Sequence, residues 1–237
     1  GTPEGATLLA EVYSKEQDVR VRAATANGHV RLESPALVDQ LMTRLQQTRG
    51  ADAERVALVN VLARFRSDQP VALLRAVLNG DDELSREAAA LGLARRGDGA
   101  ALIPLIRMLK GGHNTRAAIR HLQLLTSQAF ETESYAEQAT NYQGWATAHG
   151  TGNARAWFKD TLEMRGYDVR VVAEWLGGAS LVPPPDECVP LLLKALRDKE
   201  WYIQRNASFL LNLRIGDKAP DEIGYATAEG DVEAIIR

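Results

Sequence analysis

Apolar residues recur along most of the chain at the three- and four-residue intervals that place them on one face of an α-helix. The segment from Ala101 to Leu109 is typical, with leucine and isoleucine at positions i, i+3, i+4 and i+7. A proline in its first turn is acceptable, because the missing N–H has no helical partner there. No stretch of six residues alternates apolar and polar positions with β-branched enrichment, the pattern of a strand. The chain is therefore predicted to be all-α.

Two marks recur along the chain with the same period of about 30 to 35 residues, which predicts a repeat. The first is an arginine followed two residues later by an alanine, at Arg22, Arg55, Arg86, Arg116 and Arg205. The second is a proline that opens an apolar helix, at Pro35, Pro70, Pro104 and Pro190. Each repeat pairs an alanine-rich helix, which a neighbour can approach closely, with a leucine-rich one. We predict an α-solenoid, a right-handed superhelical stack of antiparallel helix pairs that bury a continuous core.

The repeat breaks between Thr126 and Val169, where aromatic residues gather. The residues after Ile215 resemble those after Leu125, which indicates a duplication on a larger scale. The join falls in a stretch rich in glycine and proline at 177–185, the least helical part of the chain. We therefore predict two modules, helical repeats ending in an aromatic-rich segment at 1–178 and a shorter module at 185–237, stacked on the first.

The repeat residues resemble the HEAT-repeat family, including its bacterial branch named after phycobilisome lyases. The matching pieces are an acidic or lysine-bearing turn, an arginine with alanines after it, and a second helix rich in proline and leucine. They are clearest at 18–24 (DVRVRAA) and at 198–200 (DKE) with 205–207 (RNA). The resemblance covers about 5–125 and 185–215. It implies the solenoid fold, with a concave surface lined by the second helices, and it implies no reaction.

The repeat arginines, the acidic run at 81–83 and the histidines are expected to have structural roles. The repeat arginines are expected to form a ladder, each reaching carbonyls or a carboxylate in the next unit. The run Asp81-Asp82-Glu83 is expected to cap a helix, because it lacks the spaced ligands and the glycine of a calcium loop. His113 and His121 are accompanied neither by an i, i+4 partner nor by a third zinc ligand. No metal site is predicted.

Catalytic and cofactor motifs are not found in the sequence. It contains no nucleophile-elbow motif and no glycine-rich phosphate loop. Because the sequence has one cysteine, Cys188, an internal disulfide is excluded. Cys188 is expected to be a small buried thiol. No catalytic residue and no cofactor is therefore predicted, and the protein is not expected to be an enzyme.

The composition restricts the class of partner. Hydrophobic residues make up 45% of the 237 positions and charged residues 25%, values typical of a folded chain. No apolar run approaches the length of a membrane span. The net charge of −3 argues against dependence on phosphate contacts, although the 95–120 region is locally basic. The compartment is left open.

The sequence favours a non-catalytic scaffold that binds a protein or a peptide on its concave surface. Long cationic side chains interrupt the apolar runs of the second helices and are expected to point inward, and two tryptophans could anchor a partner. These candidate binding residues are Arg44, Arg75, Arg107, Lys194, Trp145 and Trp157. One alternative is nucleic-acid binding through the basic 95–120 region. A further alternative, by analogy with the phycobilin lyases, is a lyase-like enzyme.

Overall fold

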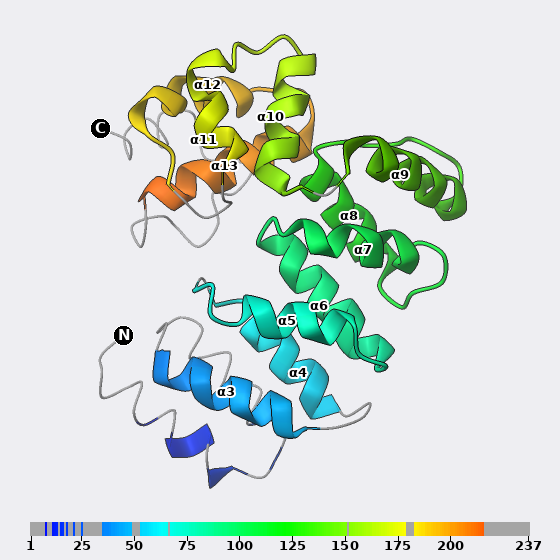
Figure 1. The fold of residues 1–237 in the computed structure, drawn as a ribbon, viewed down its shortest axis with the longest axis vertical. Coiled ribbons are helices and arrows are strands. Elements are labelled where there is room, and N and C mark those ends of the chain that lie inside the picture. The colour runs from blue at the N-terminus through cyan, green and yellow to red at the C-terminus, as the bar shows by residue number, and fades with distance from the viewer. Residues whose placement is uncertain are drawn as a thin grey trace. The chain divides into compact units, whose positions relative to one another are not determined.

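The computed structural model describes residues 8, 11–13, 15–16, 18, 21, 25, 35–48, 53–65, 67–150, 152–178 and 183–215. Every regular element in these ranges is a helix (Figure 1), so the predicted all-α class is confirmed. Among the described residues, no helix is long and apolar enough to cross a membrane. Three of the predicted features lie outside the described residues. They are the repeat arginine Arg22, the middle of the glycine- and proline-rich join, 179–182, and the C-terminal part of the predicted second module, 216–237.

The chain divides into two compact units. The first comprises Gly1–His121 and Glu131–Thr151, and the second comprises Leu122–Phe130 and Gly152–Arg237. This grouping joins 152–178 to 183–215, whereas the boundary inferred from the sequence falls between them. The predicted boundary rests on the similarity of two sequence segments, whereas the two units are defined by contacts between residues. The two modules, 1–178 and 185–237, remain a prediction.

The first unit contains a series of short helices that follow one another in chain order, from α3 to α7 (Figure 1). They are α3 (Pro35–Gln47), α4 (Ala53–Leu62), α5 (Val71–Leu78), α6 (Glu83–Arg95), the 3₁₀ turn η1 (Gly99–Ala101), α7 (Leu102–Met108), most of α8 (Thr115–Thr126) and α9 (Tyr135–His149). Helix α3 packs on α4, α5 packs on α6, and α6 also contacts α4 and α7. The predicted proline positions are confirmed, because α3 begins at Pro35, Pro70 precedes α5 and Pro104 lies in the first turn of α7.

Helix α6 is buried on nearly all sides because its residues are small. Its alanines, Ala88, Ala89 and Ala90, are at most 6% exposed, and Gly92 is buried as well. A Cβ at Gly92 would lie 2.3 Å from the Cβ of Ala63, so only glycine permits this approach to the residue after α4. The N-terminus of α6 is capped by Asp82, whose side chain accepts the N–H of Ser85 at 3.2 Å. The predicted capping turn is thereby confirmed.

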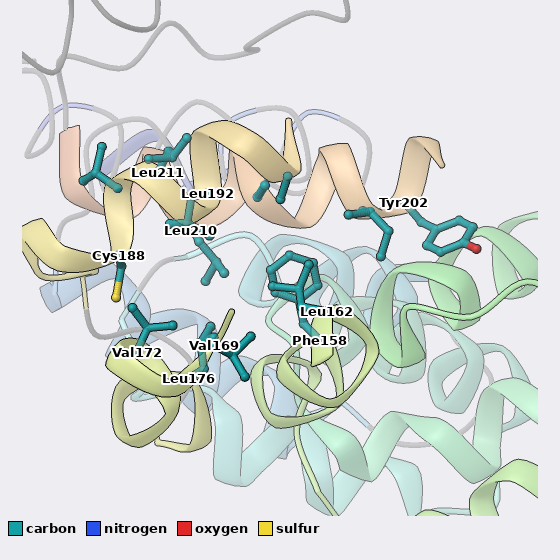
Figure 2. Packing of buried hydrophobic residues seen from close by; sticks show 14 residues of the cluster. Phe158, Leu162, Val169, Val172, Leu176, Cys188, Leu192, Tyr202, Leu210 and Leu211 are labelled. Atoms are coloured by element: carbon teal, nitrogen blue, oxygen red, sulfur yellow. The ribbon is translucent and has the colours of Figure 1, made fainter. Parts of the chain in front are cut away.

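The second unit has its own apolar core. Its helices are α10 (Ala154–Met164), η2 (Arg170–Val172), α11 (Ala173–Gly177), η3 (Asp186–Cys188), α12 (Val189–Ala195) and α13 (Trp201–Ile215). Side chains such as Phe158, Leu176, Leu192 and Leu211 gather between α10, α11, α12 and α13 (Figure 2). The segment 122–130 is joined to this unit by Asn206, whose amide donates to the carbonyl of Leu124 and to the Ser127 hydroxyl, both at 2.8 Å. The core of this unit thus collects residues from both sides of the glycine- and proline-rich join.

The close approach at Gly92 predicts opposite effects for two glycine-to-alanine changes in the first unit. Gly92→Ala should lower the free energy of unfolding by about 1–2 kcal/mol, because the clash outweighs the gain in helix propensity. Gly144→Ala, in α9, meets nothing within 4 Å and should raise it by about 0.5–1 kcal/mol. Urea unfolding followed by circular dichroism measures both. An equal gain in stability from both changes would show that α6 does not pack closely at residue 92.

Candidate functional site

The four predicted cationic residues share a position in their helices. Arg44, Arg75, Arg107 and Lys194 lie in the last turns of α3, α5, α7 and α12, where a positive charge complements the helix dipole. Position in the helix thus explains why each interrupts an apolar run. The four cationic side chains have different contacts. These contacts decide which of the four side chains is available to a partner.

Two of these arginines are held by ion pairs within the first unit. Arg44 binds Glu54 through two hydrogen bonds, from Nε to Oε1 and from Nη2 to Oε2, each 3.0 Å long. The Glu54 side chain is only 8% exposed. Arg75 donates from Nε to Oδ2 of Asp98 at 2.9 Å, and Asp98 in turn caps η1. Arg44 thus connects α3 to α4, and Arg75 connects α5 to the start of η1, which gives both a structural role.

Lys194 belongs to the second unit and lies over an aromatic ring. Its Nζ is 5.1 Å from the centroid of Tyr167, a cation–π contact. The Tyr167 hydroxyl donates to Oδ2 of Asp198 at 2.8 Å. Burial, together with this hydrogen bond to a carboxylate, raises the pKa of Tyr167 to about 12. The shift reflects how strongly the protonated hydroxyl is favoured as the donor to Asp198.

The two predicted tryptophans have different surroundings. Trp145, in the first unit, is half-buried and stacks on His149, with ring centroids 4.3 Å apart. Trp157, in the second unit, is 3% exposed, and a Cβ at Gly152 would lie 2.7 Å from its indole nitrogen. Trp157 thus fills space inside its unit. The six predicted residues are divided between two units, and the pocket that Arg107 lines in the first unit includes neither Arg44 nor Arg75.

Arg107 differs from the other cations because it lines a pocket and has no ion pair or side-chain hydrogen bond with the described residues. The pocket has a volume of about 290 Å³ and lies in the first unit, where the end of α5 and the first turns of α6 meet α7. Its lining residues are Leu78, Glu83, Arg86, Glu87, Pro104, Arg107, Met108, Lys110, Gly111 and Gly112. Arg86 and Lys110 also form no ion pair or side-chain hydrogen bond in the described part of the chain. The pocket therefore presents three unneutralised cationic side chains.

One wall of the pocket carries a buried carboxylate that organises the loop after α7. Glu87 is 4% exposed, and its Oε1 accepts the backbone N–H of His113 at 2.9 Å. Its Oε2 accepts the Asn114 side-chain amide, also at 2.9 Å. A Cβ at Gly112 would lie 2.7 Å from Oε1, so glycine is needed for the loop to cross this close to the carboxylate.

The same loop brings together three groups that are metal ligands in other proteins. One ligand atom from each of Glu83, Glu87 and His113 lies within 4.8 Å of the others. Sequence reasoning missed this cluster because His113 is 26 residues from Glu87 and approaches it only through the fold. The one available signal was the i, i+4 spacing of the two glutamates, which places both on the same helix face. The pocket thus combines a possible cation site with side chains that attract anions.

Among the predicted ladder arginines that the structure describes, Arg55 alone makes the expected contacts. Arg55 donates from Nη1 to the carbonyls of Leu45 and Thr48, at 3.2 and 2.6 Å, near the end of α3. Within the described ranges, no such bond is made by Arg86, Arg116 or Arg205, so the prediction is wrong there. The carbonyls at the end of α5 are already bonded, because Ala76 and Val77 accept the N–H groups of Asn79 and Gly80.

His121, on α8, is half-buried and does not belong to the cluster of Glu83, Glu87 and His113. Burial, and then the nearby charges of Arg95 and Arg120, lower the pKa of His121 to about 4. Its Nδ1 is buried and has no hydrogen-bond partner among the described residues. The imidazole is therefore neutral in the folded protein over the physiological range of pH.

Comparison with known proteins assigns no family to the chain. No protein-family model and no curated protein sequence matches it. The class defined by the fold is an all-helical protein, and the class defined by the site is a small charged pocket at the junction of three helices.

The ion pairs predict that Arg44 and Arg107 differ in their contribution to stability. Arg44→Ala removes two hydrogen-bond donors from the buried Glu54 carboxylate and should lower the free energy of unfolding by about 1–2 kcal/mol. Arg107→Ala should change it by less than about 0.5 kcal/mol, because no ion pair or side-chain hydrogen bond with the described residues is lost. Urea denaturation compares the two variants with the wild type. If Arg107→Ala costs as much as Arg44→Ala, Arg107 is a structural residue.

The depressed pKa of His121 predicts loss of stability in acid. As the pH falls below about 6.5, the unfolded chain takes up the proton and the folded one does not until about pH 4, so the free energy of unfolding falls in this window. The loss by pH 4.5 should be on the order of 2–3 kcal/mol. His121→Leu should remove this component, and His149→Gln, at an exposed residue, should keep it. Equal pH profiles for wild type and His121→Leu would contradict the assignment.

Proposed function

We propose that this chain is a HEAT-like α-solenoid that binds a partner protein and catalyses no reaction. The sequence repeat supports the solenoid, since both marks keep one period. The contacts of α4 and α6 are compatible with it, because these two alanine-rich helices pack on each other and each packs on its own leucine-rich neighbour. In such stacks the leucine-rich helices line one long surface, which the partner would occupy.

The observation that carries the binding proposal is the set of unneutralised cations around one pocket. Arg86, Arg107 and Lys110 line it, and in the described part of the protein none of the three has a carboxylate partner. Glu83 and Glu87 line the pocket too, so three cations face two carboxylates. Both oxygens of Glu87 already accept hydrogen bonds from the loop, and Glu83 is exposed to solvent. An aspartate or glutamate side chain of the partner would enter a volume of about 290 Å³ and supply the missing negative charge. The partner we propose is therefore an acidic segment of another protein.

Nucleic-acid binding through the 95–120 region is the second candidate. Arg107, Lys110 and Arg116 support it, because all three are exposed cations without ion pairs among the described residues. Arg96 argues against it, because its side chain is 7% exposed and donates to the Ser67 carbonyl and to Asp68, at 2.8 and 2.9 Å. The acidic net charge of −3 also opposes it. The lyase-like alternative is supported only by the family resemblance, and bilin binding would be its test.

The binding proposal predicts that three pocket cations select an acidic ligand. The probe is a short glutamate-rich peptide with a fluorescent label, titrated with the full chain and read by anisotropy at low salt. The triple variant Arg86→Gln, Arg107→Gln, Lys110→Gln should weaken binding about tenfold or more, since each lost charged contact is worth about 0.5 kcal/mol at such exposed sites. Its melting temperature should stay near that of the wild type.

Two controls make this test specific. Arg116→Gln removes an exposed cation outside the pocket and should leave the affinity for the peptide unchanged. A glutamine-rich peptide of equal length should bind neither protein. Equal affinity of the triple variant and the wild type would overturn the proposal, and tighter, steeply salt-dependent binding of duplex DNA would favour the nucleic-acid alternative. Affinity capture from the native host with wild type and triple variant would then identify the partner lost with the charges.

A further inference from the structure

We infer that Glu83, Glu87 and His113 bind one divalent transition-metal ion, with zinc as the best fit. This inference stands apart from the proposed partner binding, because it concerns the carboxylate wall of the pocket and not its cations. The set combines two carboxylates with an imidazole from a separate loop, a mixed oxygen and nitrogen donor set that suits zinc or manganese.

The distances are compatible with a single ion. The three ligand atoms lie within 4.8 Å of one another. Ligands at about 2.0–2.2 Å from a zinc ion are separated by roughly 3.3–3.6 Å in a tetrahedral site, so closure requires a shift of about 1 Å. Glu83 is exposed and the His113 side chain is 61% exposed, so rotamer changes of these two residues can supply the shift. Nδ1 of His113 is already 3.5 Å from Oε1 of Glu87.

Glu87 is the fixed member of the set. Its helix is held by the close packing of α6, and its two oxygens are oriented by the N–H of His113 and the amide of Asn114, both at 2.9 Å. Each carboxylate oxygen has a second lone pair, which stays available for an ion. Outer hydrogen bonds of this kind orient ligands in metal sites generally, and Asn114 is a positioning residue in this sense.

The charge balance also favours an ion at this place. Two carboxylates at i and i+4 on one helix face repel each other, and one of them is 4% exposed, where water screens its charge poorly. A dication between them removes this repulsion. Arg86, Arg107 and Lys110 line the same pocket and oppose a cation. Arg107 and Lys110 are exposed, so solvent and salt screen their charges, whereas Arg86 is half-buried and opposes the ion more strongly.

Three protein ligands leave coordination positions that water can fill. The adjoining pocket of about 290 Å³ has room for water molecules, each of which occupies about 30 Å³ in the liquid.

The test is calorimetric titration of the full chain with zinc chloride at neutral pH. One ion should bind per chain, and the melting temperature should rise when zinc is in excess. His113→Ala and Glu83→Gln each remove one ligand from a solvent-exposed position and should weaken zinc binding at least tenfold while the apo protein keeps its melting temperature. Titration with cobalt chloride adds a spectroscopic measurement, because the visible absorption of bound cobalt reports coordination by imidazole and carboxylate.

Matched controls are available on α9. Glu137 lies in the first turn of its helix as Glu83 does, and His149 is exposed as His113 is. Glu137→Gln and His149→Gln should bind zinc like the wild type. Unchanged zinc affinity in both His113→Ala and Glu83→Gln would overturn the inference, as would binding no tighter than about millimolar, which exposed carboxylates alone supply. Either failure leaves the peptide titration unaffected, so the two proposals are tested separately.

Discussion

The close packing of α6 is the constraint on which the first unit depends. This helix contacts α4, α5 and α7, and nearly every residue from Glu87 to Ala94 is buried. Such burial is possible only because alanine and glycine let neighbouring backbones approach, and it leaves no space for a longer side chain at Gly92. A helix held on three sides cannot rotate. The pocket residues Arg86 and Glu87 therefore have fixed backbone positions, a condition for a preorganised site.

Polar contacts between consecutive elements add directional restraints to this apolar packing. Arg55 binds carbonyls near the end of α3, Arg96 binds the turn that precedes α5, and Glu87 binds the loop that precedes α8. In each case a long side chain of one element satisfies backbone groups or a charge at the end of another. Unpaired groups of this kind are costly when buried, so each contact favours one arrangement of the helices over its alternatives.

The sequence predicted the features of the fold that depend on neighbouring residues. The all-helical class, the proline-opened helices and the capping turn at Asp82 follow from local patterns, and local chemistry also decides them in the structure. The arginine ladder failed because it needs carbonyls left free in another element. At the end of α3 such carbonyls exist, but at the end of α5 the turn at Asn79 and Gly80 already bonds them. The Glu83, Glu87 and His113 cluster was missed for a similar reason, since a loop that passes over Glu87 brings His113 to it.

Differences between equivalent positions separate structural cations from available ones. A positive charge in the last turn of a leucine-rich helix recurs at Arg44, Arg75, Arg107 and Lys194, and the helix dipole explains its recurrence. At three of these positions the fold supplies a partner, Glu54, Asp98 or the ring of Tyr167. At Arg107 the described residues supply none, and a pocket with two further unpaired cations lies beside it. The helix dipole accounts for a positive charge at all four positions, but only Arg107 lacks a partner among the described residues. This difference is the reason that the proposed acidic partner is placed at the pocket beside Arg107 and not at the other three cations.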